Sequence, residues 1–147
     1  MKRRFGNVVS RLLYGGVILT SVEYALLESL IQGLPDGIRA TVEAQFESYN
    51  LVQREIDGRA LNFYRMIRGR ADPGGIPLLK MSGEEAALIR LSAIVASDAQ
   101  LIHASLTAVA GRAFSIAFSR ALPAEGKVHV VKVKQAWRSN INLPQNA

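Results

Sequence analysis

The feature that most constrains the fold is an alternation of apolar and polar residues over positions 101–120, LIHASLTAVAGRAFSIAFSR. Successive side chains of a β-strand point to opposite faces, so this alternation predicts two strands that share one apolar face. The turn between them falls at Gly111. A three-residue loop with Gly111 in the left-handed conformation pairs Leu106 with Phe114, whereas a two-residue turn sets Phe114 against Thr107. We therefore predict the three-residue loop.

The polar residues of this stretch are small and fall on its second face, namely His103, Ser105, Thr107, Ser115 and Ser119. An ordinary solvent-exposed face of an antiparallel sheet has this composition. A flat, uncharged face of short side chains also suits a protein partner or a second copy of the chain. This polar sheet face is one candidate partner surface.

A second hairpin is predicted over residues 51–66, where two runs rich in strand formers flank Asp57-Gly58. Asp-Gly is a strong signal for a two-residue hairpin turn. Such a turn places Val52 opposite Phe63, on the face that we expect to enter the core.

Two further segments read as strands. Residues 127–137, KVHVVKVKQAW, are rich in valine, and Lys132 and Lys134 on one side are typical of a sheet edge. Residues 84–96 allow two interpretations. The SGEE at 82–85 has the spacing of a helix capping box, but the apolar ALIRLSAIV that follows suits a buried strand, which we predict.

Residues 22–31 and 38–49 carry apolar side chains at helical spacing. Gly33, Pro35 and Gly37 between them predict a turn, so an antiparallel helix pair is the simplest arrangement. The predicted fold class is α+β, with N-terminal helices packed on one face of an antiparallel β-sheet built as a meander of hairpins.

The chain is predicted to form one domain over residues 22–138, with a flexible tail at 139–147. Residues 1–21 form a basic amphipathic segment with three open interpretations: a helix docked on the core, attachment to a membrane surface through residues 2–13, or an organelle presequence. The uncharged run at 12–22 is too short for a membrane-spanning helix.

The composition is globular and basic, with a net charge of +6 over 147 residues and no Cys. Disulfides, thiolate metal ligands and a Cys nucleophile are thereby excluded, and we expect a reducing, cytoplasmic location. The charge is segregated into basic ends, a basic hairpin and an acidic helical segment, which favours phosphates, anionic lipid headgroups or an acidic protein as partners.

Motifs for chemistry are missing from the sequence. The chain has two His residues, no Gly-x-Ser-x-Gly elbow, no His-Glu-x-x-His and no glycine-rich phosphate loop. His103 shares a predicted face with Ser105 and Ser115, but a lone His on such a face is usually solvated. We predict no catalytic residues, no cofactor and no metal site. Enzyme activity stays open, although the sequence points away from it.

A basic surface is predicted around the hairpin at 51–66 and its exit, made of Arg54, Arg59, Tyr64, Arg65, Arg68 and Arg70. Arginines beside an aromatic face are the footprint of nucleic-acid binding. Neighbouring strand residues point to opposite faces, so Phe63 enters the core and only Tyr64 is left for base stacking. Arginine stems that shield a half-exposed hairpin explain the same pattern.

The function predicted from the sequence is a non-catalytic, partner-binding module for protein–protein interaction or regulation, with a protein as the expected partner. Nucleic-acid binding through the basic hairpin is the first alternative. Peripheral membrane attachment through the N-terminal segment is the second, and homo-oligomer formation stays open.

Overall fold

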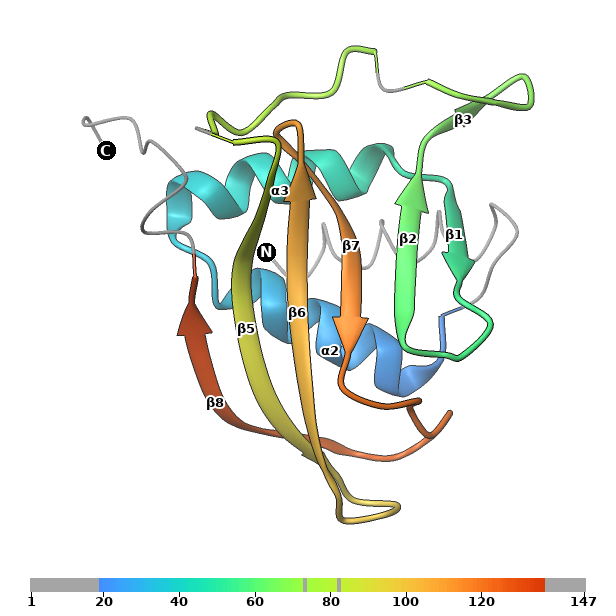
Figure 1. Cartoon of the computed structure of the whole chain (residues 1–147), viewed down its shortest axis with the longest axis vertical. Helices are drawn as coiled ribbons and strands as arrows, with labels where there is room; N and C mark the ends of the chain where they lie inside the picture. Colours follow the sequence, from blue (N-terminus) through green and yellow to red (C-terminus); the bar gives the residue numbers. More distant parts are fainter. Residues whose placement is uncertain (1–18, 73, 82, 137–147) are drawn as a thin grey trace.

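The computed structural model describes residues 19–72, 74–81 and 83–136 and has the predicted α+β architecture (Figure 1). Its elements in chain order are α2 (Ser21–Gln32), α3 (Asp36–Ser48), β1 (Leu51–Arg54), β2 (Ala60–Tyr64), β3 (Met66–Ile67), β4 (Arg70–Ala71), β5 (Glu85–Val95), β6 (Leu101–Val109), β7 (Arg112–Phe118) and β8 (Val128–Gln135). The predicted amphipathic segment up to residue 18 and the tail from 139 lie outside the described residues.

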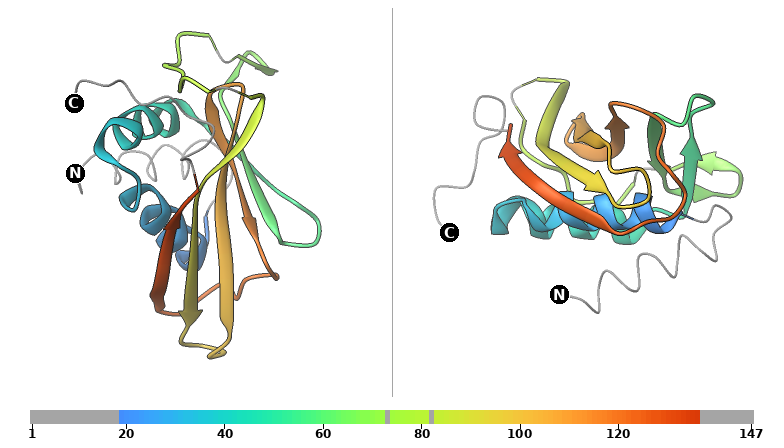
Figure 2. Two further views of the ribbon diagram at one scale, coloured as in Figure 1. Left: turned by 60° about the vertical axis from the view of Figure 1, so that its left-hand side comes forward. Right: turned by 90° about the horizontal axis from the view of Figure 1, so that it is seen from below.

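The main sheet has six antiparallel strands in the order β1-β2-β7-β6-β5-β8, and β3 and β4 form a small separate hairpin. Both helices lie on one face of the main sheet (Figure 2). The last strand, β8, crosses back to pair with β5. The sheet therefore has an inner face covered by helices and an outer face turned away from them.

The core lies between the two helices and the inner face of the sheet. Its largest fully buried side chains are Leu26, Leu27, Leu30, Ile31, Phe46, Leu61, Phe63, Leu88, Ile89, Ile102 and Leu106. They come from both helices and from β2, β5 and β6, so burial of apolar surface holds the layers together.

α2 begins at a capping box. The Thr20 hydroxyl accepts a hydrogen bond from the Glu23 amide (3.1 Å), and the Glu23 carboxylate accepts one from the Thr20 amide (3.0 Å). These bonds satisfy amides that a helix N-terminus leaves without partners. The Glu23 side chain is buried and receives Arg54 of β1 at 2.5 Å (Nη2 to Oε1). The cap thus also joins the helix to the first strand.

The hairpin of β1 and β2 has the predicted register, with Val52 opposite Phe63. The Glu55 amide donates to the Ala60 carbonyl (3.0 Å) and closes the turn around Asp57-Gly58. Phe63 is buried, as expected.

Residues 85–95 form strand β5, so the strand interpretation is confirmed. β5 pairs with β6 on one side and β8 on the other, and its inward side chains are buried. A segment in this central position gains two ladders of backbone hydrogen bonds, which outweighs the local capping-box spacing.

The predicted three-residue loop between β6 and β7 is wrong. Ala110 (φ 50°) and Gly111 (φ 82°) form a two-residue turn with positive φ at both positions, which fits the twist of a hairpin. The register shifts between Ala108 and Thr107. Ala108 pairs with Ala113, whereas Thr107 pairs with Ser115 and Leu106 with Ile116. Phe114 is the extra residue of a β-bulge, and the bulge returns the following apolar residues to the inner face.

β8 lies at the sheet edge, as its lysines indicated. Lys132 and Lys134 are exposed and lie opposite Ser92 and Arg90 of β5. Charged residues on an edge strand discourage pairing with other chains.

Candidate functional site

The candidate site lies where the ladder between β2 and β7 ends. The two strands pair from Ala60 and Ala117 to Asn62 and Ser115. Beyond Ser115 the bulge at Phe114 bends β7, and Figure 1 shows the beginning of β7 curving away from β2. The separation of the strands opens a space at the end of the sheet.

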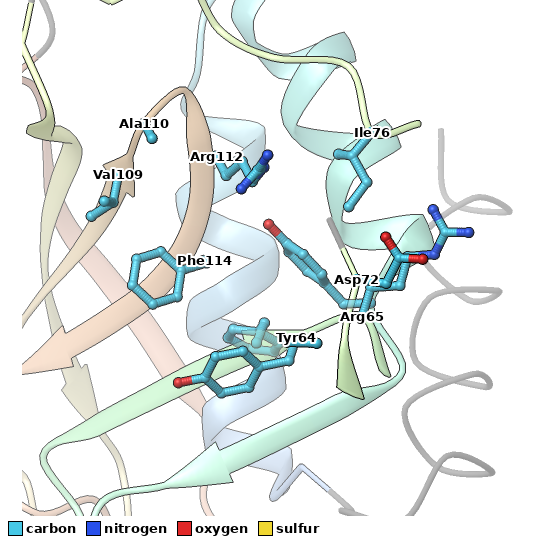
Figure 3. Close-up of a pocket in the computed structure, with 11 residues that line it drawn as sticks. Tyr64, Arg65, Asp72, Ile76, Val109, Ala110, Arg112 and Phe114 are labelled. Atoms are coloured by element: carbon cyan, nitrogen blue, oxygen red, sulfur yellow. The ribbon is translucent and has the colours of Figure 1, made fainter. Parts of the chain in front are cut away.

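This space, here called the β2–β7 pocket, has a volume of about 250 Å³. Its lining residues are Tyr49, Phe63, Tyr64, Arg65, Ala71, Asp72, Ile76, Val109, Ala110, Arg112 and Phe114. Most of these side chains are aromatic or aliphatic. Figure 3 shows Val109 and Phe114 on one side of the pocket and Ile76, Asp72 and Arg65 on the other, with the Arg112 side chain reaching between them.

The segment after β4 forms one wall of the pocket and is held by hydrogen bonds at several points. Arg65 donates from Nη1 to the Gly74 carbonyl (2.5 Å), and the Asp72 carboxylate accepts from the Gly74 amide (2.8 Å). Further along, the Leu79 amide donates to the Gly111 carbonyl (2.8 Å). This wall is therefore joined both to Arg65, which directly follows β2, and to the turn between β6 and β7.

Gln45 of α3 fixes the same region from beneath and is fully buried. Its Nε2 donates to the carbonyls of Pro77 (2.7 Å) and Gly111 (2.8 Å), and its Oε1 accepts from the Ala113 amide (2.8 Å). One side chain thus connects a helix, the pocket wall and the start of β7.

Tyr49 forms the floor of the pocket with an edge-to-face aromatic contact to Phe46 at 5.2 Å between ring centroids. Its hydroxyl donates to the Ala113 carbonyl at 2.6 Å. Burial raises the pKa of Tyr49 well above its usual value of 10, and the positive charge of Arg112 opposes that rise. The hydroxyl therefore stays protonated and donates its hydrogen bond to the Ala113 carbonyl. The Arg112 guanidinium lies close enough for its charge to influence the pKa of Tyr49.

Arg112 is the one pocket cation with no partner among the described residues. Its Nε is buried and unbonded, and no hydrogen bond or ion pair joins its guanidinium to any residue that the structure describes. A buried polar group without a partner carries a free-energy cost that a bound molecule can relieve.

The predicted basic surface is divided in space. Arg54 and Arg59 lie near the turn of the first hairpin, whereas Tyr64 and Arg65 line the pocket at the opposite end of β2. Arg68 and Arg70 follow in the exposed hairpin of β3 and β4.

Arg54 is engaged in the fold through its bonds to Glu23, and Arg65 through its bond to Gly74. Of the predicted set, Tyr64 and Arg65 belong to the candidate pocket. Nucleic-acid binding by the set as a whole stays a prediction.

The predicted polar sheet face is present on the outer side of β6 and β7. Thr107 pairs with Ser115, but Ser105 lies opposite Ala117. His103 is exposed, and its Nδ1 lies 2.8 Å from the Ser92 hydroxyl of β5.

The Ser119 hydroxyl accepts a hydrogen bond from the His103 amide (3.0 Å). The nearest hydroxyl partner of His103 is thus Ser92, and neither Ser105 nor Ser115. These contacts organise an exposed polar surface, and its role as a partner surface stays a prediction.

Sequence reasoning missed Arg112, Tyr49 and Phe114 as site residues. One signal was present, because Arg112 is the only Asp, Glu, Lys or Arg between Asp98 and Arg120. A single charge in a long uncharged hairpin has no neighbouring charge with which to pair.

No group of three or more metal-ligating side chains occurs among the described residues. In the same part of the chain, every helix is too short or too polar to cross a membrane. Comparison of the sequence with protein-family models and curated proteins, and of the structure with solved structures, gave no match.

Proposed function

We propose that this protein is a non-catalytic binding module that holds a small, largely apolar molecule in the β2–β7 pocket. The proposal rests on the pocket itself, a concave space lined by aromatic and aliphatic side chains with few polar groups. Sites for small molecules usually have this composition. The sequence predicted a protein as the partner, and this proposal puts a small ligand in its place.

The construction of the pocket supports the same function. Gln45, Tyr49 and Arg65 each bond to the backbone around it, so its walls are held before any ligand arrives. A preformed site loses little conformational entropy on binding. The cytoplasmic location expected from the Cys-free composition remains part of this proposal.

The test replaces an exposed residue at the pocket with a larger one, so that the new side chain fills the pocket. Ala71 lines the pocket but is itself exposed, so Ala71→Trp adds a large ring with little risk to the core. Ala40→Trp makes the same change on the exposed side of α3 and serves as the control. Binding of a set of small aromatic and alicyclic compounds is measured by ligand-observed NMR.

We expect several compounds to bind, to compete with one another for a single site, and to lose binding in Ala71→Trp but not in Ala40→Trp. Absence of binding to the unmodified protein, or binding that Ala71→Trp leaves unchanged, would contradict the proposed function.

A further inference from the structure

We propose that the ligand of the β2–β7 pocket is a small aromatic carboxylate and that Arg112 binds its carboxylate group. This inference rests on the proposed function and adds to it the chemical class of the ligand and the residue that selects it.

The first support is the set of unused donors on Arg112. A guanidinium carries five N–H donors in a planar fork and keeps its charge at every physiological pH. In the described part of the chain none of these donors meets an acceptor, and Nε is shielded from solvent. A carboxylate matches this fork with two parallel hydrogen bonds and supplies the missing negative charge.

The second support is the state of the other polar groups in the pocket. Arg65 donates to the Gly74 carbonyl, and Tyr49 donates to the Ala113 carbonyl. Asp72 accepts from the Gly74 amide and forms no ion pair with Arg112 in the described structure. Arg65 thus has one donor bound to the pocket wall, whereas no donor of Arg112 is bound to a described residue, so Arg112 has its whole guanidinium fork available.

The third support is the size of the pocket. An apolar cavity of about 150 Å³ holds benzene, which corresponds to about 25 Å³ for each non-hydrogen atom. By this scale, the 250 Å³ of the β2–β7 pocket holds about ten such atoms. One aromatic ring with a short acidic arm has that size.

The fourth support is the character of the walls. The rings of Tyr64 and Phe114 are 6.4 Å apart between centroids, and Tyr49 and Phe63 line the same space. Aromatic walls favour a flat ring as the ligand body. They solvate charge poorly, and Asp72 adds a negative charge at the rim, so a monoanion suits the site better than a phosphate dianion.

The experiment compares phenylacetate with phenylacetamide, which have nearly the same shape but differ in charge. Dissociation constants at pH 7 are measured by ligand-observed NMR for the unmodified protein and for Arg112→Met, Arg65→Met and Arg68→Met. Arg112→Met keeps a long apolar side chain but removes the donors. Arg68→Met removes the same charge from the exposed hairpin of β3 and β4 and controls for net charge.

We expect the unmodified protein and Arg68→Met to bind phenylacetate about tenfold or more tightly than phenylacetamide, because hydrogen bonds to a charged group are strong. In Arg112→Met this preference should disappear while phenylacetamide still binds, which also shows that the variant keeps its pocket.

The outcomes separate the two proposals. Equal binding of both compounds to the unmodified protein overturns the role of Arg112 and leaves the proposed function intact. A preference that Arg65→Met abolishes and Arg112→Met retains overturns the assignment to Arg112. Binding of neither compound overturns the inference, while the wider set of compounds still tests the proposed function.

Discussion

At the scale of single residues, Tyr49 shows how the fold fixes a pocket group. Its hydroxyl donates to the Ala113 carbonyl inside the protein, so Tyr49→Phe leaves that carbonyl without this partner. We expect the variant to lose about 1–2 kcal/mol of unfolding free energy at pH 7. Tyr64→Phe is the matched control, because the Tyr64 hydroxyl makes no hydrogen bond to any described residue.

The same tyrosine predicts a dependence of stability on pH. The folded state raises the pKa of Tyr49 above 10, whereas the unfolded chain titrates near 10. Below pH 10 both states keep the proton. Above it the unfolded state releases the proton first, so Tyr49 lowers stability as pH rises. In urea unfolding, the difference between the unmodified protein and Tyr49→Phe should therefore shrink above pH 10, and a constant difference would contradict this account.

At the scale of elements, Gln45 joins α3 to both walls of the pocket. In Gln45→Leu the Pro77 carbonyl and the Ala113 amide lose a buried partner. We expect a loss of about 2–4 kcal/mol in urea unfolding at pH 7, together with weaker ligand binding. Gln32→Leu makes the same chemical change at an exposed helix position and should stay within about 0.5 kcal/mol of the unmodified protein. Equal effects of the two changes would contradict the role of Gln45.

The registers of the two hairpins differ in how far they could be predicted from the sequence. The register of β1 and β2 was predictable because Asp57-Gly58 sets the turn locally and the apolar pattern permits one pairing. The register of β6 and β7 was not, because a β-bulge at Phe114 separates the turn from the apolar pattern. The Phe114 ring contacts Tyr64, which lies on a different strand. Such a contact depends on tertiary structure and cannot be predicted from the apolar and polar alternation within one hairpin.

The candidate site was predictable only in part for the same reason. Tyr64 and Arg65 were singled out because they belong to a run of arginines beside aromatic residues. Arg112 and the segment around Ile76 come together only through long-range bonds, such as that from Leu79 to Gly111. Gly111 itself shows the closeness of this approach, since a Cβ atom there would lie 2.6 Å from the Leu79 carbonyl oxygen. Sequence alone does not reveal which loop covers a turn.

At the scale of the whole molecule, the structure combines a helix-covered sheet with a mostly apolar pocket at the end of the β2–β7 ladder. The net charge of +6 favours the approach of anions in general. Arg112, which has no partner among the residues that the structure describes, gives that general attraction a specific place. We therefore expect a small acidic ligand to bind in this pocket and at no other part of the described surface.

The most direct test is a two-dimensional ¹H–¹⁵N NMR titration of the labelled protein with phenylacetate. We expect saturable shifts in the amides of Tyr64, Arg65, Ile76, Arg112 and Phe114, which come from three separate parts of the chain and line the same pocket. Shifts confined to the exposed polar sheet face or to β8, or no saturable shifts at all, would contradict this expectation.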